Sequence, residues 1–148
     1  TKFNDVPEVE EDLCIPFGRA RIVAEGADIT VVTNSMMTIK AEKAVRQLQK
    51  EGISAELIDL RTIVPLDTET IIRSVKKTGK LLIVDEGHLS FGITGEIASR
   101  IMPDVFYDLD APIQRMGTAD VPLPFSPALE FPLIPDEKKI AAKIREMV

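Results

Sequence analysis

Asp85, Glu86 and His88 form the group of residues in this sequence that most resembles an acid–base site. A carboxylate near a histidine can orient the imidazole, which then accepts a proton at near-neutral pH. No nucleophile accompanies the three residues, and side chains of these types also satisfy the backbone of a turn or stay solvated. We therefore keep them as a candidate strand-end cluster and assign no catalytic residue.

Three glycines, Gly87, Gly92 and Gly95, lie within and after this cluster. A glycine-rich turn between a strand and a helix can bind phosphate through backbone N–H groups and the helix dipole. The spacing differs from the dinucleotide-binding fingerprint, the loop holds no Lys or Arg, and Glu96 would repel a phosphate. We therefore expect the glycines to permit close backbone packing, and the sequence indicates no cofactor-binding residue.

Arg61 begins the most distinctive segment of the chain, RTIVPLD at residues 61–67. An arginine at the end of a strand can hold a carboxylate with two parallel hydrogen bonds. That carboxylate could belong to a substrate acid, or to Asp59 or Asp85 of the same chain. We favour the second alternative, in which Arg61 fixes its own loop.

The composition bounds the class of protein. The chain has 148 residues, 45% hydrophobic and 28% charged, which suits a single globular domain. A net charge of −6 with one tyrosine and no tryptophan argues against nucleic-acid binding. No apolar run approaches the roughly 18 residues that span a membrane. One cysteine, Cys14, and one histidine supply neither a disulfide framework nor the about four ligands of a usual zinc site.

Residues 1–17 are expected to form an acidic interdomain linker. Five acidic side chains crowd this stretch, with Pro7 and Pro16 as breakers. Such a stretch buries too little apolar surface to offset the entropy of ordering it. The chain begins with Thr1 rather than methionine and shows no signal peptide, so we expect a partial or processed chain from the cytoplasm or an organelle matrix, the cytoplasm being favoured.

The elements that must position these residues alternate from Arg19 onward. Short β-branched runs predict buried strands, and apolar residues at i, i+4, i+7 and i+8 from Met37 to Leu48 predict an amphipathic helix. Asp67 is suited to cap the next helix and Gly79 to end it. Strands are expected at residues 21–24, 29–33, 53–60, 80–85 and 110–116, and helices near 37–48, 68–78, 97–103 and 138–148, with a proline-rich loop at 117–135.

Strands and helices that alternate with short links predict a parallel sheet covered on both faces. In such sheets, ligands or partners meet the carboxyl ends of the strands. Those ends are residues 33–35, 59–62 and 85–88. The candidate cluster and Arg61 are therefore expected at one edge of the sheet.

Six segments give the chain a resemblance to a known family. They are EGADITVV (25–32), GISAELIDLRTI (52–63), PLDTETI (65–71), SVKKTG (74–79), LDAP (109–112) and ADVPLP (119–124). From Ile15 onward the chain resembles the C-terminal domain of the beta subunit of thiamine-dependent 2-oxoacid dehydrogenases, with pyruvate dehydrogenase the nearest. Residues 18–148 would then be a transketolase C-terminal-like domain.

The resemblance implies a three-layer α/β/α sandwich with a five-stranded, mostly parallel sheet whose first strand is antiparallel. It also implies that the complete enzyme binds thiamine diphosphate and Mg²⁺ outside this fragment, which would be inactive alone. The implied partners are an alpha subunit, a second beta subunit in a heterotetramer with two of each, and the subunit-binding domain of a dihydrolipoamide acyltransferase. Nucleic acid and membrane are not expected.

The resemblance also implies two docking groups. In relatives, the aspartate of the LDAP segment contacts a basic residue of the acyltransferase, and here that aspartate is Asp110. The C-terminal carboxylate contributes as well, and here it belongs to Val148. Two anions beside a partner's Lys or Arg are a reasonable docking site.

Several alternatives stay open. Beta subunits of acetoin and branched-chain 2-oxoacid dehydrogenases share these segments, so the sequence does not fix the substrate. A free-standing α/β binding module and a small enzyme that uses Asp85, Glu86 and His88 are the other hypotheses. The acidic linker favours a domain that belongs to a larger subunit.

Overall fold

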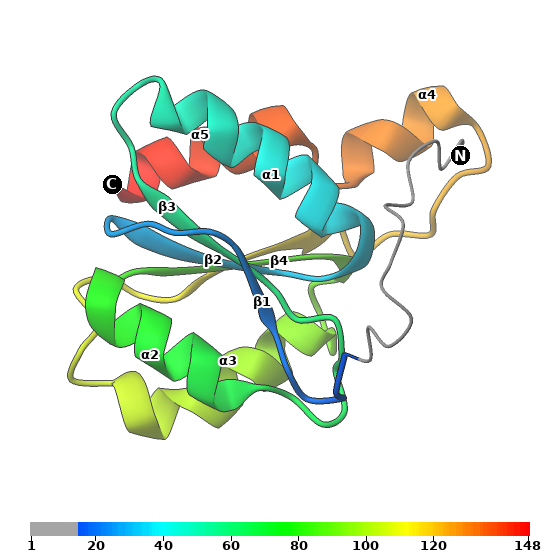
Figure 1. Cartoon of the computed structure of the whole chain (residues 1–148). Coiled ribbons are helices and arrows are strands. Elements are labelled where there is room, and N and C mark those ends of the chain that lie inside the picture. Colours follow the sequence, from blue (N-terminus) through cyan, green and yellow to red (C-terminus); the bar gives the residue numbers. More distant parts are fainter. Residues whose placement is uncertain (1–14) are drawn as a thin grey trace, which may run out of the picture.

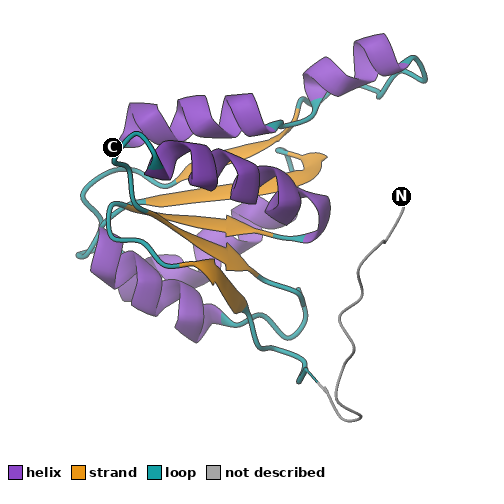
Figure 2. Ribbon diagram, turned by 45° about the horizontal axis from the view of Figure 1, so that its top comes forward, coloured by secondary structure: helices purple, strands orange, loops and turns teal. Residues whose placement is uncertain are grey.

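The computed structural model describes residues 15–148, which build a sheet between two helical layers (Figures 1 and 2). The strands are β1 (Arg21–Ala24), β2 (Ile29–Thr33), β3 (Ala55–Asp59), β4 (Leu81–His88) and β5 (Gln114–Thr118). The helices are α1 (Ser35–Gln49), α2 (Thr68–Thr78), α3 (Ile93–Val105), α4 (Pro127–Glu130), the 3₁₀ turn η1 (Phe131–Leu133) and α5 (Glu137–Met147). Most of the predicted linker lies outside the described residues.

The five strands follow the order β1-β3-β2-β4-β5 across the sheet. Only the β1–β3 pair is antiparallel, and all the other neighbouring pairs run parallel. Helices α1 and α5 cover one face, whereas α2 and α3 cover the other (Figure 1). The predicted three-layer sandwich with an antiparallel first strand is therefore confirmed.

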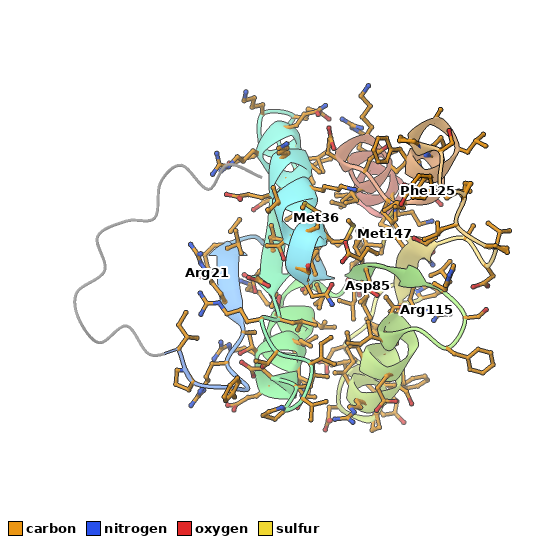
Figure 3. All side chains as sticks on the ribbon, turned by 90° about the vertical axis from the view of Figure 1, so that its right-hand side faces the viewer. Arg21, Met36, Asp85, Arg115, Phe125 and Met147 are labelled. Atoms are coloured by element: carbon orange, nitrogen blue, oxygen red, sulfur yellow. The ribbon has the colours of Figure 1, made fainter. Side chains whose placement is uncertain are left out.

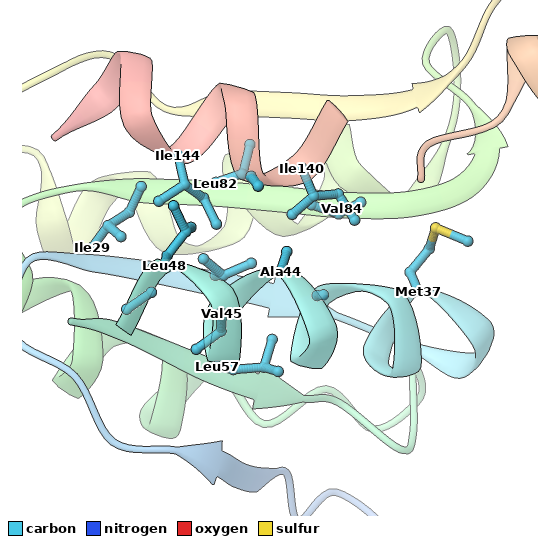
Figure 4. Close-up of a cluster of buried hydrophobic side chains, with 14 residues drawn as sticks. Ile29, Met37, Ala44, Val45, Leu48, Leu57, Leu82, Val84, Ile140 and Ile144 are labelled. Carbon is cyan, nitrogen blue, oxygen red and sulfur yellow. The ribbon is translucent and has the colours of Figure 1, made fainter. Parts of the chain in front are cut away.

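The sheet separates two hydrophobic cores because successive residues of a strand point to opposite faces. Val31 and Leu57 belong to the core under α1 and α5 (Figure 4), whereas Val32 and Ile58 belong to the core under α2 and α3. All five residues of β2 are buried, as expected for a strand with neighbours on both sides and helices on both faces. The apolar stripe predicted on α1 is also buried.

The predicted ends of α2 are confirmed. The Asp67 side chain accepts a hydrogen bond from the Thr70 N–H in the first turn. Gly79 ends the helix with φ of 68°, and its N–H donates to the Val75 carbonyl. A left-handed conformation at this position costs glycine little, which is why the helix stops here.

The helix predicted to end at Pro103 instead continues to Val105, so this prediction was wrong. Proline lacks an N–H, so the carbonyl four residues earlier loses its helical hydrogen bond, and the proline ring also crowds that carbonyl. That carbonyl belongs to Ser99, which is exposed and can bond to water instead. The loss is therefore small enough for the last turn to form.

Other boundaries also differ from the prediction. Strand β4 continues past Asp85 to His88, and β3 is shorter than the predicted 53–60. Strand β5 begins after Pro112, because a proline cannot donate to the strand ladder. The predicted loop at 117–135 contains the last residues of β5, helix α4 and the turn η1.

Asp67 joins two parts of the chain, the residue before β1 and the first turn of α2. Besides capping α2, its carboxylate accepts hydrogen bonds from the Ala20 N–H at 2.9 Å and from the Thr70 hydroxyl at 2.8 Å. Burial alone would raise the pKa of Asp67, but these bonds outweigh burial and lower it. The ionised carboxylate therefore stabilises the junction between the start of β1 and the start of α2.

Replacing Asp67 with alanine should lower the free energy of unfolding by about 1–2 kcal/mol at pH 7. The pKa of Asp67 is lower in the folded than in the unfolded state. Its contribution to the free energy of unfolding is therefore fully present above the unfolded pKa and is lost as the pH falls through the folded pKa. The difference between the two proteins should therefore shrink toward pH 3. Urea unfolding from pH 7 to pH 3 measures this. Asp136→Ala is the control, because Asp136 caps α5 through a single exposed hydrogen bond from the Lys139 N–H. If both variants lose the same free energy of unfolding, Asp67 does not link β1 to α2.

Candidate functional site

The carboxyl edge of the parallel strands carries the polar residues predicted there. The ends of β2, β3 and β4 bring Asn34, Asp59 and His88 to this edge, which Figure 3 faces with Asp85 labelled. Ligands usually meet doubly covered sheets here. A ligand site is therefore expected at this edge.

The strand-end cluster is less connected than an acid–base site requires. One Asp85 oxygen accepts a hydrogen bond from the Gly87 N–H at 3.0 Å, which satisfies the local backbone. His88 Nδ1 lies 2.9 Å from the Ala119 carbonyl oxygen. Within residues 15–148, no hydrogen bond or ion pair joins His88 to Asp85 or to Glu86. The geometry matches the backbone-satisfying alternative better than a catalytic one.

A different carboxylate lies near the histidine. Asp120 accepts hydrogen bonds from the Ser90 N–H at 3.2 Å and from the Ser90 hydroxyl at 2.6 Å. These bonds, and to a smaller extent the charge of His88, lower the pKa of Asp120. The Ser90 hydroxyl donates to the Asp120 carboxylate and not to His88. His88 therefore does not activate Ser90 as the histidine of a nucleophilic triad would. The arrangement joins the loop after β4 to the loop after β5.

Of Gly87, Gly92 and Gly95, which were predicted to permit close backbone packing, only Gly92 does so, because a Cβ at Gly87 or Gly95 would meet only side-chain atoms of Asp85 (2.7 Å) or Arg115 (3.1 Å). A Cβ atom at Gly92 would lie 2.0 Å from the His88 carbonyl oxygen. A Cβ at Gly117 would lie 2.7 Å from the carbonyl oxygen of Gly87. Real Cβ atoms do not approach backbone this closely, so a larger residue would displace the loop. Packing explains these glycines without a bound phosphate.

Within the part of the chain that the structure describes, the Arg61 guanidinium forms no hydrogen bond or ion pair, so the predicted role of Arg61 in fixing its loop is wrong for these residues. Its N–H donates to Asp59 Oδ1 at 3.2 Å, and its side chain is exposed. The loop is held by Asp67 and by Thr62, whose hydroxyl accepts from the Gly18 N–H at 2.9 Å and donates to the Pro65 carbonyl at 3.1 Å. Arg61 lines an open cavity of about 550 Å³ at the carboxyl edge.

The segment EGAD at residues 25–28 is a structural clasp. The N–H groups of Ala27 and Asp28 both donate to the Ser54 carbonyl at 2.9 Å, and the Asp28 carboxylate accepts from the Ser54 N–H at 2.7 Å. Gly26 packs so tightly against the start of β3 that a Cβ would lie 2.2 Å from backbone atoms of Ala55 and Glu56. The clasp fixes the turn between β1 and β2 against β3.

The predicted docking residues lie at the opposite, amino edge of the sheet. The Asp110 N–H donates to the Gly79 carbonyl at 2.8 Å, just before β4 begins. Helix α5 is fastened to the turn after α1 by the Arg145–Glu51 ion pair at 2.8 Å, which brings Val148 to the same edge (Figure 1). Asp110 and Val148 are both exposed. The fold thus places both predicted anions on one edge, away from the strand-end cluster.

A groove beside Asp110 was not predicted from the sequence. It has a volume of about 590 Å³ and lies between α3 and the segment that leads into β5. Ala98 and Met102 of α3, together with Phe106 directly after the helix, repeat at i, i+4 and i+8 and form one wall. This second apolar stripe was the signal in the sequence that could have indicated the groove.

Comparison with known proteins gives one consistent result. The profile of the family "Transketolase, C-terminal domain" matches residues 18–140. The pyruvate dehydrogenase E1 component subunit beta of Rickettsia felis is 47% identical over 143 residues, which cover 97% of this chain and 43% of that protein. The acetoin:2,6-dichlorophenolindophenol oxidoreductase subunit beta of Cupriavidus necator is 42% identical over 97% of this chain and 42% of its own length.

Among solved structures, a chain of a split-gene transketolase, described as an inactive beta4 tetramer, superposes with a TM-score of 0.77. It is 27% identical and covers 96% of this chain and 46% of its own. The chain therefore spans less than half the length of the relatives it matches. Among residues 15–148, no helix has the length and apolarity needed to cross a membrane. The profile match over most of the chain, together with the fold, shows that the chain belongs to the transketolase C-terminal domain family.

Proposed function

We propose that this chain is the C-terminal domain of the beta subunit of the decarboxylating component of a 2-oxoacid dehydrogenase complex, with pyruvate as the substrate. The 47% identity to a pyruvate dehydrogenase beta subunit over 97% of the chain carries this proposal. The complete enzyme would oxidatively decarboxylate pyruvate and acylate the lipoyl groups of a dihydrolipoamide acyltransferase, supplying acetyl-CoA. Residues 1–17 would be the linker, residues 18–148 the domain, and the location the cytoplasm or an organelle matrix.

The described residues do not fit thiamine diphosphate or its Mg²⁺ ion. Within residues 15–148, no three His, Cys, Asp or Glu side chains converge as metal ligands would. At the amino end of α3, Glu96 pairs with Arg100, and the Arg115 guanidinium donates to the Leu89 carbonyl. We propose that the cofactor binds in other parts of the complete enzyme, and we assign no catalytic step to this chain.

The proposed roles of the domain are subunit assembly and docking. Its partners would be an alpha subunit and a second beta subunit in a tetramer with two of each, and the subunit-binding domain of the acyltransferase. The position of Asp110 and Val148 at the amino edge supports docking, since both residues are exposed there and a basic partner would be attracted to Asp110. Because the strand-end cluster lies at the other edge, docking would leave it free.

An acetoin dehydrogenase beta subunit is the second candidate function. The observation that favours it is the 42% identity to the Cupriavidus necator protein, which is close to the value for the pyruvate enzyme. Steady-state rates of the complete enzyme with pyruvate and with acetoin separate the two. A rate with acetoin above that with pyruvate would replace the proposed substrate.

Asp110→Asn in the complete enzyme should weaken binding of the acyltransferase subunit-binding domain at least about tenfold, or about 1.4 kcal/mol. The substitution removes one anion from a cationic contact but keeps the side-chain size. Decarboxylation with an artificial electron acceptor should be unchanged. Surface plasmon resonance at two salt concentrations measures the effect, and salt should weaken the wild-type complex more than the variant.

Glu86→Gln is the matched control for Asp110→Asn. It removes the same charge from an exposed position at the carboxyl edge and should leave binding unchanged. Equal affinities of the wild type and Asp110→Asn, without any salt dependence, would remove Asp110 from the docking site.

A further inference from the structure

A cavity of about 550 Å³ opens at the carboxyl edge of the sheet, between the ends of the parallel strands β2 and β3. Asn34 and Ser35, which follow β2, form one wall. The other wall is formed by residues between 59 and 63, where β3 ends and its connection begins. Residues 15–17 close a third side, and most of the surface that lines the cavity is apolar.

The chain leaves β2 and β3 toward opposite faces of the sheet at this point. Helix α1, which follows β2, covers one face together with α5, whereas α2, which follows β3, covers the other (Figure 1). The two connections therefore diverge and leave a crevice outside the strand ends. In open α/β sheets, such a divergence is the usual place of ligand binding. The cavity occupies this crevice.

Arg61 brings a positively charged side chain to the crevice. Its guanidinium is exposed and forms neither a hydrogen bond nor an ion pair within residues 15–148. The nearby Asp59 does not pair with it, because Asp59 Oδ1 instead accepts hydrogen bonds from the Arg61 N–H and from the Thr38 hydroxyl. Of the two predicted roles of Arg61, the described residues thus leave the one in which it holds a carboxylate from another molecule.

Both walls contain a residue in an unusual backbone conformation. Ser35 has φ of 49° and Arg61 has φ of 56°, in the left-handed region that residues other than glycine rarely adopt. Such residues cluster at ligand-binding sites. Asn34 Oδ1, on the same wall as Ser35, has no hydrogen-bond partner within the described chain. Turning this amide so that its NH₂ group faces a carboxylate would therefore break no hydrogen bond of the oxygen.

We propose that the crevice binds a small monocarboxylic acid with an apolar body, whose carboxylate meets the Arg61 guanidinium through two parallel hydrogen bonds. The apolar lining matches the body of such a molecule. A phosphate, with its higher charge, would fit less well, because Asp59 adds a negative charge to the wall that carries Arg61. Binding here would be a property of this domain and does not depend on the reaction of the complete enzyme.

Titration of the 148-residue chain with benzoate, followed by nitrogen–proton correlation NMR, tests this site. Benzoate combines a carboxylate with an apolar ring and should bind with a Kd of about 1 mM, shifting the amide signals of Ser35 and Thr62. Acetate lacks the ring and should bind at least about fivefold more weakly. Benzyl alcohol lacks the charge and should give no saturable shift.

Arg61→Asn removes the charge, and asparagine tolerates a left-handed backbone, so the variant should keep the fold. It should weaken benzoate binding at least about tenfold. Ile63→Ser removes apolar lining and should reduce the advantage of benzoate over acetate. Arg73→Gln is the matched control, because Arg73 is an exposed arginine of α2 that does not line the cavity, and its affinity should equal that of the wild type.

Several results would overturn the proposal. Benzoate could give no saturable shift, or it could shift amide signals of α3 and not those of Ser35 and Thr62. Equal affinities of the wild type and Arg61→Asn would show that the guanidinium does not hold the carboxylate. Tighter binding of inorganic phosphate than of benzoate would assign the crevice to a different class of anion.

Discussion

Replacing Gly26 with alanine is expected to lower the free energy of unfolding by about 3 kcal/mol, at the upper end of the usual cost of overpacking. A Cβ at this position would lie 2.2 Å from the carbonyl carbon of Ala55 and the nitrogen of Glu56. Both are backbone atoms of a strand that pairs on both sides, so they cannot move aside as a flexible side chain can. The turn between β1 and β2 must shift instead, which opens the clasp around Ser54.

Urea unfolding followed by circular dichroism measures this loss, and Gly52→Ala is the matched control. Gly52 has φ of 87° and open space around it, so alanine there adds backbone strain but no collision. Its expected cost is about 1 kcal/mol. A cost for Gly26→Ala no larger than that for Gly52→Ala would show that the turn adapts and that close packing does not decide this position.

Lys77→Met is expected to destabilise the domain by about 2 kcal/mol or more, below the roughly 3–5 kcal/mol of a fully buried pair. The side chain of Glu56 is 2% exposed and forms an ion pair with Lys77, which is 45% exposed. Burial alone would raise the pKa of Glu56, but hydrogen bonds from Lys77 and other neighbours outweigh burial and lower it. Without Lys77, a buried carboxylate would lose its main partner.

The pH dependence provides a second readout for this variant. In the wild type the lowered pKa of Glu56 means that its contribution is present above the unfolded pKa and is lost at lower pH. In Lys77→Met, burial would dominate and raise the pKa of folded Glu56. Protonation of Glu56 would then remove the cost of burying its charge. The difference in unfolding free energy between variant and wild type should therefore be larger at pH 7 than at pH 4.

Lys76→Met is the control for Lys77→Met, because it removes a neighbouring charge whose pairing with Asp108 is long and exposed. Its effect should be within about 0.5 kcal/mol of zero. A pH-independent loss of the same size in both variants would mean that general surface charge, and not the Glu56 contact, is responsible.

The sequence indicated the fold well because its signals are local. The buried stripe of α1, the cap at Asp67 and the stop at Gly79 each depend on one residue type at one position. Prediction was poorer where the outcome depends on what surrounds a residue. Proline usually breaks a helix, yet the exposed last turn of α3 tolerates Pro103. Strand β4 extends to His88 through an irregular pairing with β5, which leaves no repeating pattern in the sequence.

The candidate site was predicted less completely than the fold. The sequence suggested that Arg61 pairs with a carboxylate such as Asp85. The hydrogen bonds that hold the loop at residues 61–67 are instead made by Thr62 and Asp67. His88 was paired with its sequence neighbours, whereas its nearby carboxylate, Asp120, comes from a different strand end. Contacts between loops depend on the sheet order, which the sequence pattern alone does not specify.

The two edges of the sheet are separated by whole strands, and this separation bears on how such a domain can evolve. A five-residue strand spans about 17 Å, so within residues 15–148 the edge near Asp110 and the edge near His88 lie too far apart for side-chain contact. Effects of substitutions at sites this far apart usually add independently. If the amino edge has the proposed docking role, substitutions near Asp110 that alter partner choice can therefore accumulate without affecting the surface near His88.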